Sequence, residues 1–413
     1  MLHGAFHLRG EAALTGSAHA LAARAAKGRG RVGRRILITG AGTGASNNLI
    51  RSLRTGDPSL FIVGCHADRF ALKQSSADRN YLIPALTQPG FLAGLRRIIR
   101  AERTDLLFPS TDADVRVISG SRHKIPCHLL LPRHAVIELC QDKYKLTRFL
   151  RSRGIPAPLT YPVTGLDGID KTFRRLAPHR SLVWCRIRTG NGSAGAMPVK
   201  RAEQARSWIR YWKEMRGVPA RFFTLSEYLP GRDFGCQSLW RAGELILVKT
   251  FERLSYVVSG SQASGVSSVA ALSKTVFAPG VTEVCAKAVR SLDPRASGVF
   301  CIDVKEDARG VPCITEVNAG RFSLSTNVYD LVGTHNMAVT YVRLALGERV
   351  DIREQYDVAE NYYMVRDLDT LPGIFHAEAF LGGIIDARPA PRATGHRRTS
   401  PNRRTRHGHL HRG

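Results

Sequence analysis

The sequence predicts an α/β protein in which a parallel sheet is followed by antiparallel hairpins. Between residues 35 and 109, short apolar strand patterns alternate with helical patterns, as in a Rossmann-type parallel sheet. From residue 222 onward, strand patterns follow one another across short turns, which is typical of hairpins. The chain has 413 residues, of which 43% are hydrophobic, enough for two or three domains with their own cores.

The positive charge of the chain is concentrated at its two ends. The formal net charge is +27; residues 1–35 carry seven Lys and Arg against one acid, and residues 387–413 carry eight Arg and no acid. Both ends lack regularly spaced apolar residues, so we expect a disordered basic leader over 1–33 and a disordered basic tail over 387–413. The remaining charge and the lack of an aromatic-plus-basic motif predict no specific nucleic-acid partner.

The lengths of the apolar runs and the spacing of the cysteines indicate in which cellular compartment the protein is expected. No apolar run approaches the roughly 18–20 residues that cross a bilayer, so we expect no membrane partner. The eight cysteines form no C-x-x-C pair, and several lie within apolar runs. This pattern favours buried thiols in a reducing cytoplasm over a disulfide or zinc framework, and we therefore expect a cytoplasmic protein.

The first ordered part of the chain begins at Arg35. Its expected elements are a strand at Ile36–Thr39, a tight turn at Gly40–Gly44, a helix from Asn47, a strand at Phe61–Gly64, a helix at Leu92–Arg103 and a strand at Asp105–Pro109. The glycine turn and Asp68 match part of a dinucleotide site, although such glycines also serve close packing. The segment Pro109–Asp114 follows the last strand, where α/β sheets bind ligands, or else it caps the next helix.

The second part opens with a helix and a glycine-rich loop. The helix runs from Asp142 to Gly154, and the prolines at 156 and 158 then impose an extended chain. The next strand, Leu182–Ile187, carries Arg186 in an apolar run and leads into a loop that contains Gly192, Ser193 and Gly195. Backbone N–H groups of such a loop can cover phosphates above a cation, whereas the alternative is an ordinary surface turn.

A strand that breaks and resumes comes next. It runs from Phe222, breaks at Pro230–Gly231 and resumes at Asp233. Adenine needs an apolar slot with backbone donors and acceptors, which Glu227, Tyr228 and Leu229 offer at the strand end. Asp233 then offers a carboxylate for a ribose, and the alternative is an antiparallel meander whose acid has protein partners.

The most informative segment is the hairpin formed by Cys301–Lys305 and Ile314–Asn318. Glu316 and Asn318 are two residues apart, so both point to one face of a strand, and the hairpin sets Asp303 opposite them. Two carboxylates and an amide oxygen suit a hard cation such as Mg²⁺. Ile, Val and Cys alternate with the acids, which favours a buried metal site over an exposed hairpin with solvated acids.

Taken in order, these motifs resemble the ATP-grasp superfamily, and within it the carbamoyl-phosphate-synthase-like group, over about residues 36 to 350. The resemblance implies a Rossmann-like pre-ATP-grasp domain and an ATP-grasp domain made of two α+β subdomains. The implied segments are a leader (1–33), the pre-ATP-grasp domain (34–135), the ATP-grasp domain (136–350), a closing segment (351–386) and a tail (387–413). Within the closing segment, Tyr362–Arg366 is predicted to be a closing strand or an interface, so we also expect a homodimer as one state.

The resemblance also implies roles for individual residues. Lys143 and Arg186 match cations on the ATP phosphates, and Arg321 and Arg186 match catalytic cations. The other nucleotide-binding matches are Gly192, Ser193, Gly195, Glu227, Tyr228, Leu229 and Asp233. Asp303, Glu316 and Asn318 match the metal ligands. The family's N-P-R is here Asn318-Ala319-Gly320-Arg321, which moves the arginine by one position, and a bulge at Gly320 would restore its aim.

The implied activity is an ATP- and Mg²⁺-dependent carboxylate–amine ligase, with Mn²⁺ as an alternative metal. Such an enzyme phosphorylates a small-molecule carboxylate to an acyl phosphate, which an amine then attacks. Phosphoryl transfer needs positioning and charge neutralisation rather than a nucleophilic side chain. The alternatives are an NAD(P)-binding Rossmann oxidoreductase and an ATP-binding protein that has lost its catalysis.

Overall fold

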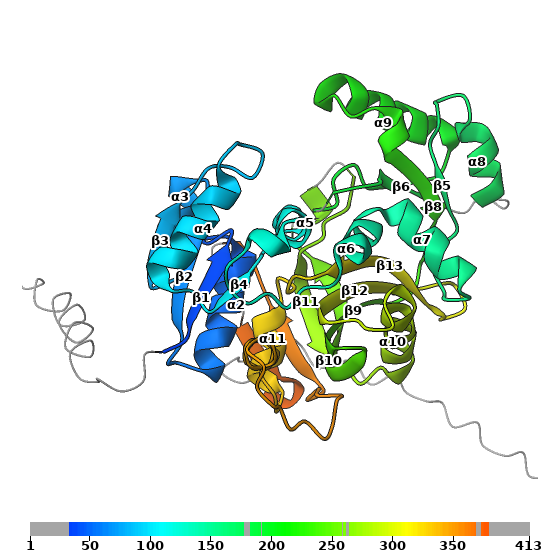
Figure 1. The fold of residues 1–413 in the computed structure, drawn as a ribbon. Helices are drawn as coiled ribbons and strands as arrows, with labels where there is room; N and C mark the ends of the chain where they lie inside the picture. Colours follow the sequence, from blue (N-terminus) through cyan, green and yellow to red (C-terminus); the bar gives the residue numbers. More distant parts are fainter. Residues whose placement is uncertain are drawn as a thin grey trace, which may run out of the picture.

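The computed structural model describes residues 33–176, 182–190, 192–257, 259–261, 264–368 and 373–379 (Figure 1). The predicted basic segments lie outside these ranges, apart from Gly33. Within the described ranges, no helix is long and apolar enough to cross a membrane. All eight cysteines are described and are free thiols, seven of them buried and Cys127 partly buried, as the sequence predicted.

A four-stranded parallel sheet forms the first layer, in the order β3-β2-β1-β4. Its strands are β1 (Arg35–Thr39), β2 (Phe61–His66), β3 (Arg79–Leu82) and β4 (Leu106–Phe108). The helices of this part are α2 (Gly44–Gly56), α3 (Arg69–Lys73), α4 (Phe91–Glu102) and α5 (Asp112–Gly120). This is the predicted alternation of strands and helices, but β3 is an addition that the sequence did not predict.

A connecting segment leads from this sheet to the rest of the chain. It contains the 3₁₀ turn η1 (Arg122–Lys124) and the helices α6 (His134–Gln141) and α7 (Lys143–Ser152). Asp142 caps α7, since its side chain accepts a hydrogen bond from the backbone N of Lys145. The helix and its start are therefore as predicted.

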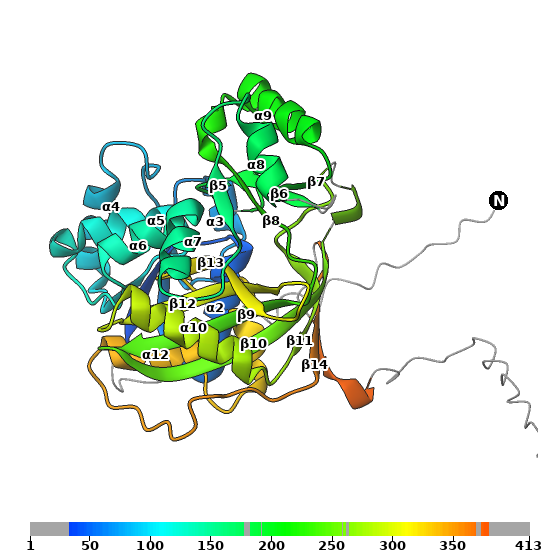
Figure 2. The same cartoon turned by 90° about the vertical axis from the view of Figure 1, so that its right-hand side faces the viewer.

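A small antiparallel sheet carries the glycine-rich loop, in the order β5-β8-β6-β7. Its strands are β5 (Thr160–Pro162), β6 (Val183–Ile187), β7 (Met197–Val199) and β8 (Phe223–Glu227). The helices α8 (Ile169–Leu176) and α9 (Ala202–Arg216) pack on it through apolar residues such as Phe173 and Ile209, followed by η2 (Ala220–Phe222). Figure 2 shows this unit standing above the larger sheet.

The larger sheet has seven strands in the order β13-β12-β9-β10-β11-β14-β15. Its strands are β9 (Asp233–Arg241), β10 (Glu244–Tyr256), β11 (Ala270–Thr275), β12 (Gly298–Glu306), β13 (Pro312–Ala319), β14 (Tyr362–Val365) and β15 (Gly373–His376). The remaining elements are α10 (Pro279–Leu292), α11 (Thr326–Val332), α12 (Met337–Ala345), η3 (Ser259–Ser261) and η4 (Ala377–Ala379). The segment Tyr362–Arg366 thus contains a strand that pairs with β11 and β15.

Two hydrophobic cores hold the larger sheet in place. On one face, α6, α7 and α10 cover Phe234, Ile302 and other buried side chains. A second core joins the larger sheet to the parallel sheet, since Phe108 of β4 lies 4.6 Å from Tyr341 of α12 between ring centroids. The parallel sheet and the larger sheet are therefore packed through one shared core, which brings the end of β4 close to the end of β13.

Candidate active site

Charged residues share one face of the larger sheet. Asp303 of β12 pairs with Glu316 of β13 and with Gly235 of β9, and Asp233 of β9 pairs with Arg253 of β10. Residues directly opposite one another on neighbouring strands point to the same face, and so do residues two apart on one strand. Asp233, Arg253, Asp303 and Glu316 therefore line one face, as the sequence predicted for Asp303 and Glu316.

The two carboxylates of the predicted metal site are partly exposed. The side chains of Asp303 and Glu316 are 33% and 21% exposed, so both can reach a ligand above the sheet. Asn318 lies two residues after Glu316, opposite Cys301. Among the described residues, no group of three or more His, Cys, Asp and Glu side chains is arranged for a metal ion. The donor set of two carboxylates and one amide fits Mg²⁺, which commonly takes few protein ligands alongside substrate phosphates.

Lys143 reaches this face from the first turn of α7. Its side chain is buried, and Nζ lies 2.6 Å from the carbonyl oxygen of Gly190 and 3.4 Å from Glu316 Oε1. The neighbouring Asp142 accepts two hydrogen bonds from Arg188, at 2.7 and 2.6 Å. Burial alone would raise the pKa of Asp142, but the hydrogen bonds from Arg188 and from the backbone N of Lys145, together with the positive charges of both side chains, outweigh it and lower that pKa. The ion pair and Lys143 together tie α7 to the start of the glycine-rich loop.

Arg186 connects the small sheet to the β12–β13 hairpin. Its Nη2 donates to the carbonyl oxygen of Thr315 at 3.0 Å, while its buried Nε has no hydrogen-bond partner among the described residues. Burial lowers the pKa of Arg186, and Glu316 and Asp303 oppose this effect. A buried donor without a partner is costly, and an anionic ligand would satisfy it.

Four described residues of the glycine-rich loop have positive φ angles. The φ angles are 123° at Gly190, 65° at Gly192, 57° at Ser193 and 64° at Gly195, all in the left-handed range. The indole of Trp208 on α9 donates to the carbonyl oxygen of Gly195 at 3.0 Å. Asn191 lies outside the described residues.

The predicted adenine segment lies between β8 and β9. Leu229 is buried, Tyr228 lies 6.3 Å from Trp184 between ring centroids, and the backbone N of Glu227 donates to the carbonyl oxygen of Leu159 at 2.9 Å. The exposed side chain of Glu227 lines a cavity of about 720 Å³ beneath the β12–β13 turn. The segment is therefore a short linker between the two antiparallel sheets, and its contact with adenine stays a prediction.

Asp233 takes part in an ion network that the sequence did not predict. Arg253 Nη1 donates to Asp233 Oδ1 at 2.7 Å, the Tyr256 hydroxyl donates to Oδ2, and Lys305 Nζ lies 3.6 Å away. Arg253 also donates to Asp303 through Nη2. Asp233 thus lies beside the predicted metal ligand Asp303 with its oxygens already bound, and a contact with ribose stays a prediction.

Arg321 points into the site and also reaches the parallel-sheet domain. Its Nη2 donates to Asn318 Oδ1 at 2.7 Å, and its guanidinium pairs with Asp112 at the start of α5. Gly320 has φ of 92°, and an added Cβ there would come within 2.9 Å of Val115. A glycine therefore suits this position, and its predicted effect on the aim of Arg321 stays a prediction. The one-residue shift of the arginine also leaves the oxygen of Asn318, a predicted metal ligand, bound to Arg321.

The segment Pro109–Asp114 caps the next helix, which is one of its two predicted roles, and its contact with a ligand stays a prediction. Thr111 caps α5, while Asp112 lines a cavity of about 700 Å³ that also contacts Lys143, Glu316 and Asn318. The cavity extends between α5, α6 and α7. It is therefore an open space beside Lys143 and Glu316, two of the predicted site residues.

Sequence reasoning missed Arg253, Tyr256 and Lys305. The signal that would have found Arg253 is the alternation of Lys249, Phe251 and Arg253 along β10, because these residues share the face of Asp233. This alternation along β10 places a second cation on the charged face.

No protein-family model and no curated protein sequence matches this chain. Solved structures do resemble it. An L-amino acid ligase from Bacillus licheniformis has a TM-score of 0.61 at 12% identity, covering 81% of this chain and 79% of the ligase. A biotin carboxylase from Campylobacter jejuni has a TM-score of 0.60 at 15% identity, covering 80% of this chain and 74% of the carboxylase. A carboxyaminoimidazole ribonucleotide synthase from Aspergillus clavatus, solved with ATP, has a TM-score of 0.60 at 14% identity, covering 81% of each chain.

Proposed function

The chain has the ATP-grasp fold, and from this fold and its charged face we propose that it is an ATP- and Mg²⁺-dependent ligase. The proposed reaction transfers the γ-phosphoryl group of ATP to a small-molecule carboxylate, and an amine then displaces phosphate from the acyl phosphate. The observation that carries the proposal is the convergence of Lys143, Arg186 and the glycine-rich loop on the Asp303–Glu316 pair. The proposed compartment is the cytoplasm.

The cations act on the phosphates in this proposal. The ammonium of Lys143 lies 3.4 Å from Glu316, and Arg186 binds the carbonyl oxygen of the preceding residue Thr315. Both cations would hold phosphate oxygens in line for transfer, with Nε of Arg186 as the donor that has no partner among the described residues. Backbone N–H groups of the loop at Gly192, Ser193 and Gly195 would cover the same phosphates.

Asp303 and Glu316 would hold Mg²⁺ or Mn²⁺, which neutralises charge on the transferred group. Asn318 completes the proposed donor set once its oxygen is released by Arg321. Arg321 contacts two residues that line the cavity, Asn318 and Asp112, and would offset negative charge on the acyl phosphate. Because Arg321 still contacts a predicted metal ligand, Asn318, its position favours an active enzyme over an ATP-binding protein that has lost catalysis.

Two observations count against the oxidoreductase alternative. An added Cβ at Gly42 would come 1.7 Å from the carbonyl oxygen of Ala71, so this glycine permits close packing of α3. The carboxylate of Asp68 caps α3 by accepting from the backbone N of Phe70 at 2.8 Å. Both features of the expected dinucleotide motif therefore have structural roles.

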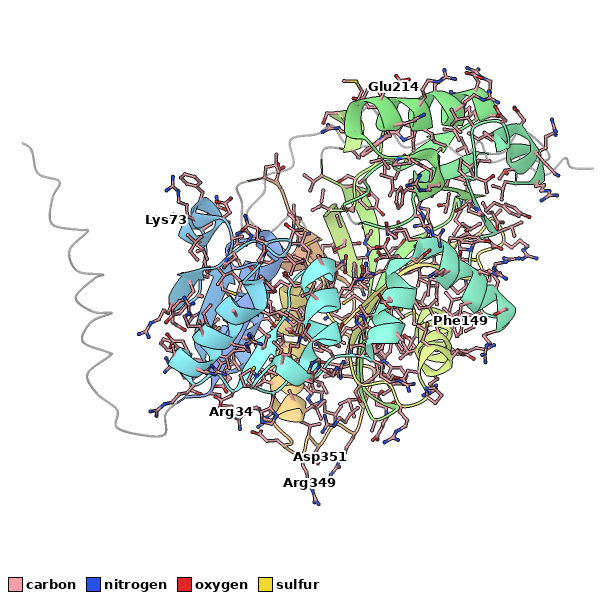
Figure 3. The ribbon with its side chains drawn as sticks, turned by 45° about the horizontal axis from the view of Figure 1, so that its top comes forward. Arg34, Lys73, Phe149, Glu214, Arg349 and Asp351 are labelled. Carbon is pink, nitrogen blue, oxygen red and sulfur yellow. The ribbon has the colours of Figure 1, made fainter. Side chains whose placement is uncertain are left out.

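The test is release of ADP and phosphate by the purified full chain in a screen of carboxylates with amines, including amino acids and dipeptides. Glu316→Gln removes one anionic donor and should lower turnover at least a hundredfold with the fold intact, since such a contact contributes about 3 kcal/mol or more. The matched control is Glu214→Gln, an exposed position on α9 (Figure 3) that should keep full turnover. ADP release by Glu316→Gln at the wild-type rate would show that the metal assignment is wrong.

A further inference from the structure

The guanidinium of Arg253 binds the carboxylate of Asp303, which the metal would need as a ligand. The Arg253 side chain is 14% exposed and lies between two acids, with Nη1 donating to Asp233 and Nη2 donating to Asp303. Nη1 also donates to the carbonyl oxygen of Phe234 at 3.0 Å. The predicted metal ligand Asp303 is therefore already neutralised by a residue of the neighbouring strand β10.

The other donors of the site are also paired with cations. Lys143 lies 3.4 Å from Glu316, and Arg321 donates to Asn318. A free divalent cation that entered here would have to displace Arg253 from Asp303 and Lys143 from Glu316. The displaced cations would stay close to the metal and partly buried, with less compensating negative charge, which is unfavourable.

A polyphosphate removes this obstacle. Its oxygens can accept hydrogen bonds from the displaced cations at the moment when the carboxylates turn to the metal. Arg253 remains bound to Asp233 when it leaves Asp303. Asp233 is itself held in place by a hydrogen bond from the Tyr256 hydroxyl and by the nearby Lys305. An arginine side chain keeps its proton in proteins, so the guanidinium of Arg253 stays positively charged when the metal approaches Asp303.

We propose that Arg253 is an internal counter-ion of Asp303 that makes divalent-cation binding depend on a bound polyphosphate. The inference rests on the proposed function, because it takes the polyphosphate to be that of ATP. Arg253 thereby has a positioning role, because it controls when Asp303 is free to bind the metal. Arg253 is not among the site residues predicted from sequence. The metal then enters with the nucleotide and not before it.

The experiment measures Mn²⁺ binding to the full chain by electron paramagnetic resonance, with and without a non-hydrolysable ATP analogue. Without nucleotide, the wild-type protein should bind Mn²⁺ weakly, and Arg253→Gln should bind it on the order of tenfold more tightly. With the analogue, the difference should shrink, because phosphates then hold Arg253. Circular dichroism checks that the variant is folded.

The matched control is Lys305→Gln, which removes one positive charge from the same sheet face. Lys305 lies near Asp233 rather than on Asp303, so this variant should bind Mn²⁺ like the wild type in the absence of nucleotide. An equal gain from Lys305→Gln would overturn the inference in favour of a general effect of net charge. Equally tight Mn²⁺ binding by the wild-type protein with and without the analogue would overturn it as well, even if Arg253→Gln did not fold.

Failure of the proposed function has a different signature. In that case the analogue itself would not bind, as measured by calorimetry, although the contrast between wild type and Arg253→Gln in the absence of nucleotide would persist. That contrast would support Arg253 as a counter-ion and reject ATP as its polyphosphate.

Discussion

The glycine-rich loop offers two alanine substitutions that differ in one physical respect. Gly192 and Gly195 have nearly equal φ angles of 65° and 64°, a conformation that costs an L residue about 1–2 kcal/mol. An added Cβ at Gly192 has no described atom within 4 Å. At Gly195 it would come 2.7 Å from Ile187 Cγ1 and 3.1 Å from Phe223 Cε1. The pair therefore separates backbone strain from steric conflict.

The expected magnitudes follow from these contacts. Gly192→Ala should cost only the backbone term, and the entropy that alanine removes from the unfolded chain is common to both variants and cancels. Gly195→Ala must also move Ile187 and the fully buried Phe223, which adds about 1–3 kcal/mol of overpacking. In a domain of 150–250 residues this difference corresponds to a melting temperature roughly 2–12 °C lower for Gly195→Ala.

The assay is thermal unfolding followed by circular dichroism, together with tryptophan emission. The Trp208 indole donates to the carbonyl oxygen of Gly195, so Gly195→Ala should shift its emission, while Gly192→Ala should leave it close to that of the wild type. Equal melting temperatures for the two variants would refute the argument from close contacts. Unchanged Mg-ATP affinity in both variants would refute the role of this loop as a phosphate cover.

Three further outcomes are expected. Mg-ATP should raise the melting temperature of the protein and NAD(P) should not, and a shift with NAD alone would reverse the choice between ligase and oxidoreductase. A chain spanning residues 34–386 should keep ATP turnover and lose low-salt binding to polyanions, and loss of turnover in a well-folded chain would assign the tails a substrate or assembly role. Asp142→Asn retains a capping side chain but removes the charge paired with Arg188. Because the pKa of Asp142 lies below its ordinary value of 3.8, its ionised form adds stability above that pH. The difference in melting temperature between wild type and Asp142→Asn should therefore shrink as the pH falls below 3.8, and a constant difference would contradict the ion-pair argument.

Local features of the site were open to prediction from sequence. The Asp303–Glu316 pairing follows from two alternating strands joined by a short turn, and the register confirms it. The helix start at Asp142 follows from its capping side chain. In both cases the residues that decide the structure are close in sequence, so the pattern contains most of the information.

The edge strand β3 shows where pattern reading fails within a sheet. Its residues Arg79–Leu82 are mostly exposed and do not alternate between polar and apolar types. The strand exists because β2 offers it an unpaired edge, with Val63 opposite Arg79. The neighbour that decides this element is 16 positions away and leaves no periodic trace in the segment itself.

The sequence by itself determined the order of the elements, the glycine-rich loop and the two carboxylates of the hairpin, because side-chain periodicity and turn chemistry act over a few residues. Tertiary structure alone decided that Arg253 binds Asp303 and that Arg321 pairs with Asp112, 209 residues away. The strand order β13-β12-β9-β10 is not the order along the chain, so periodicity assigns each residue to a face without saying which faces meet. The packing of the hydrophobic cores decides which faces lie against one another.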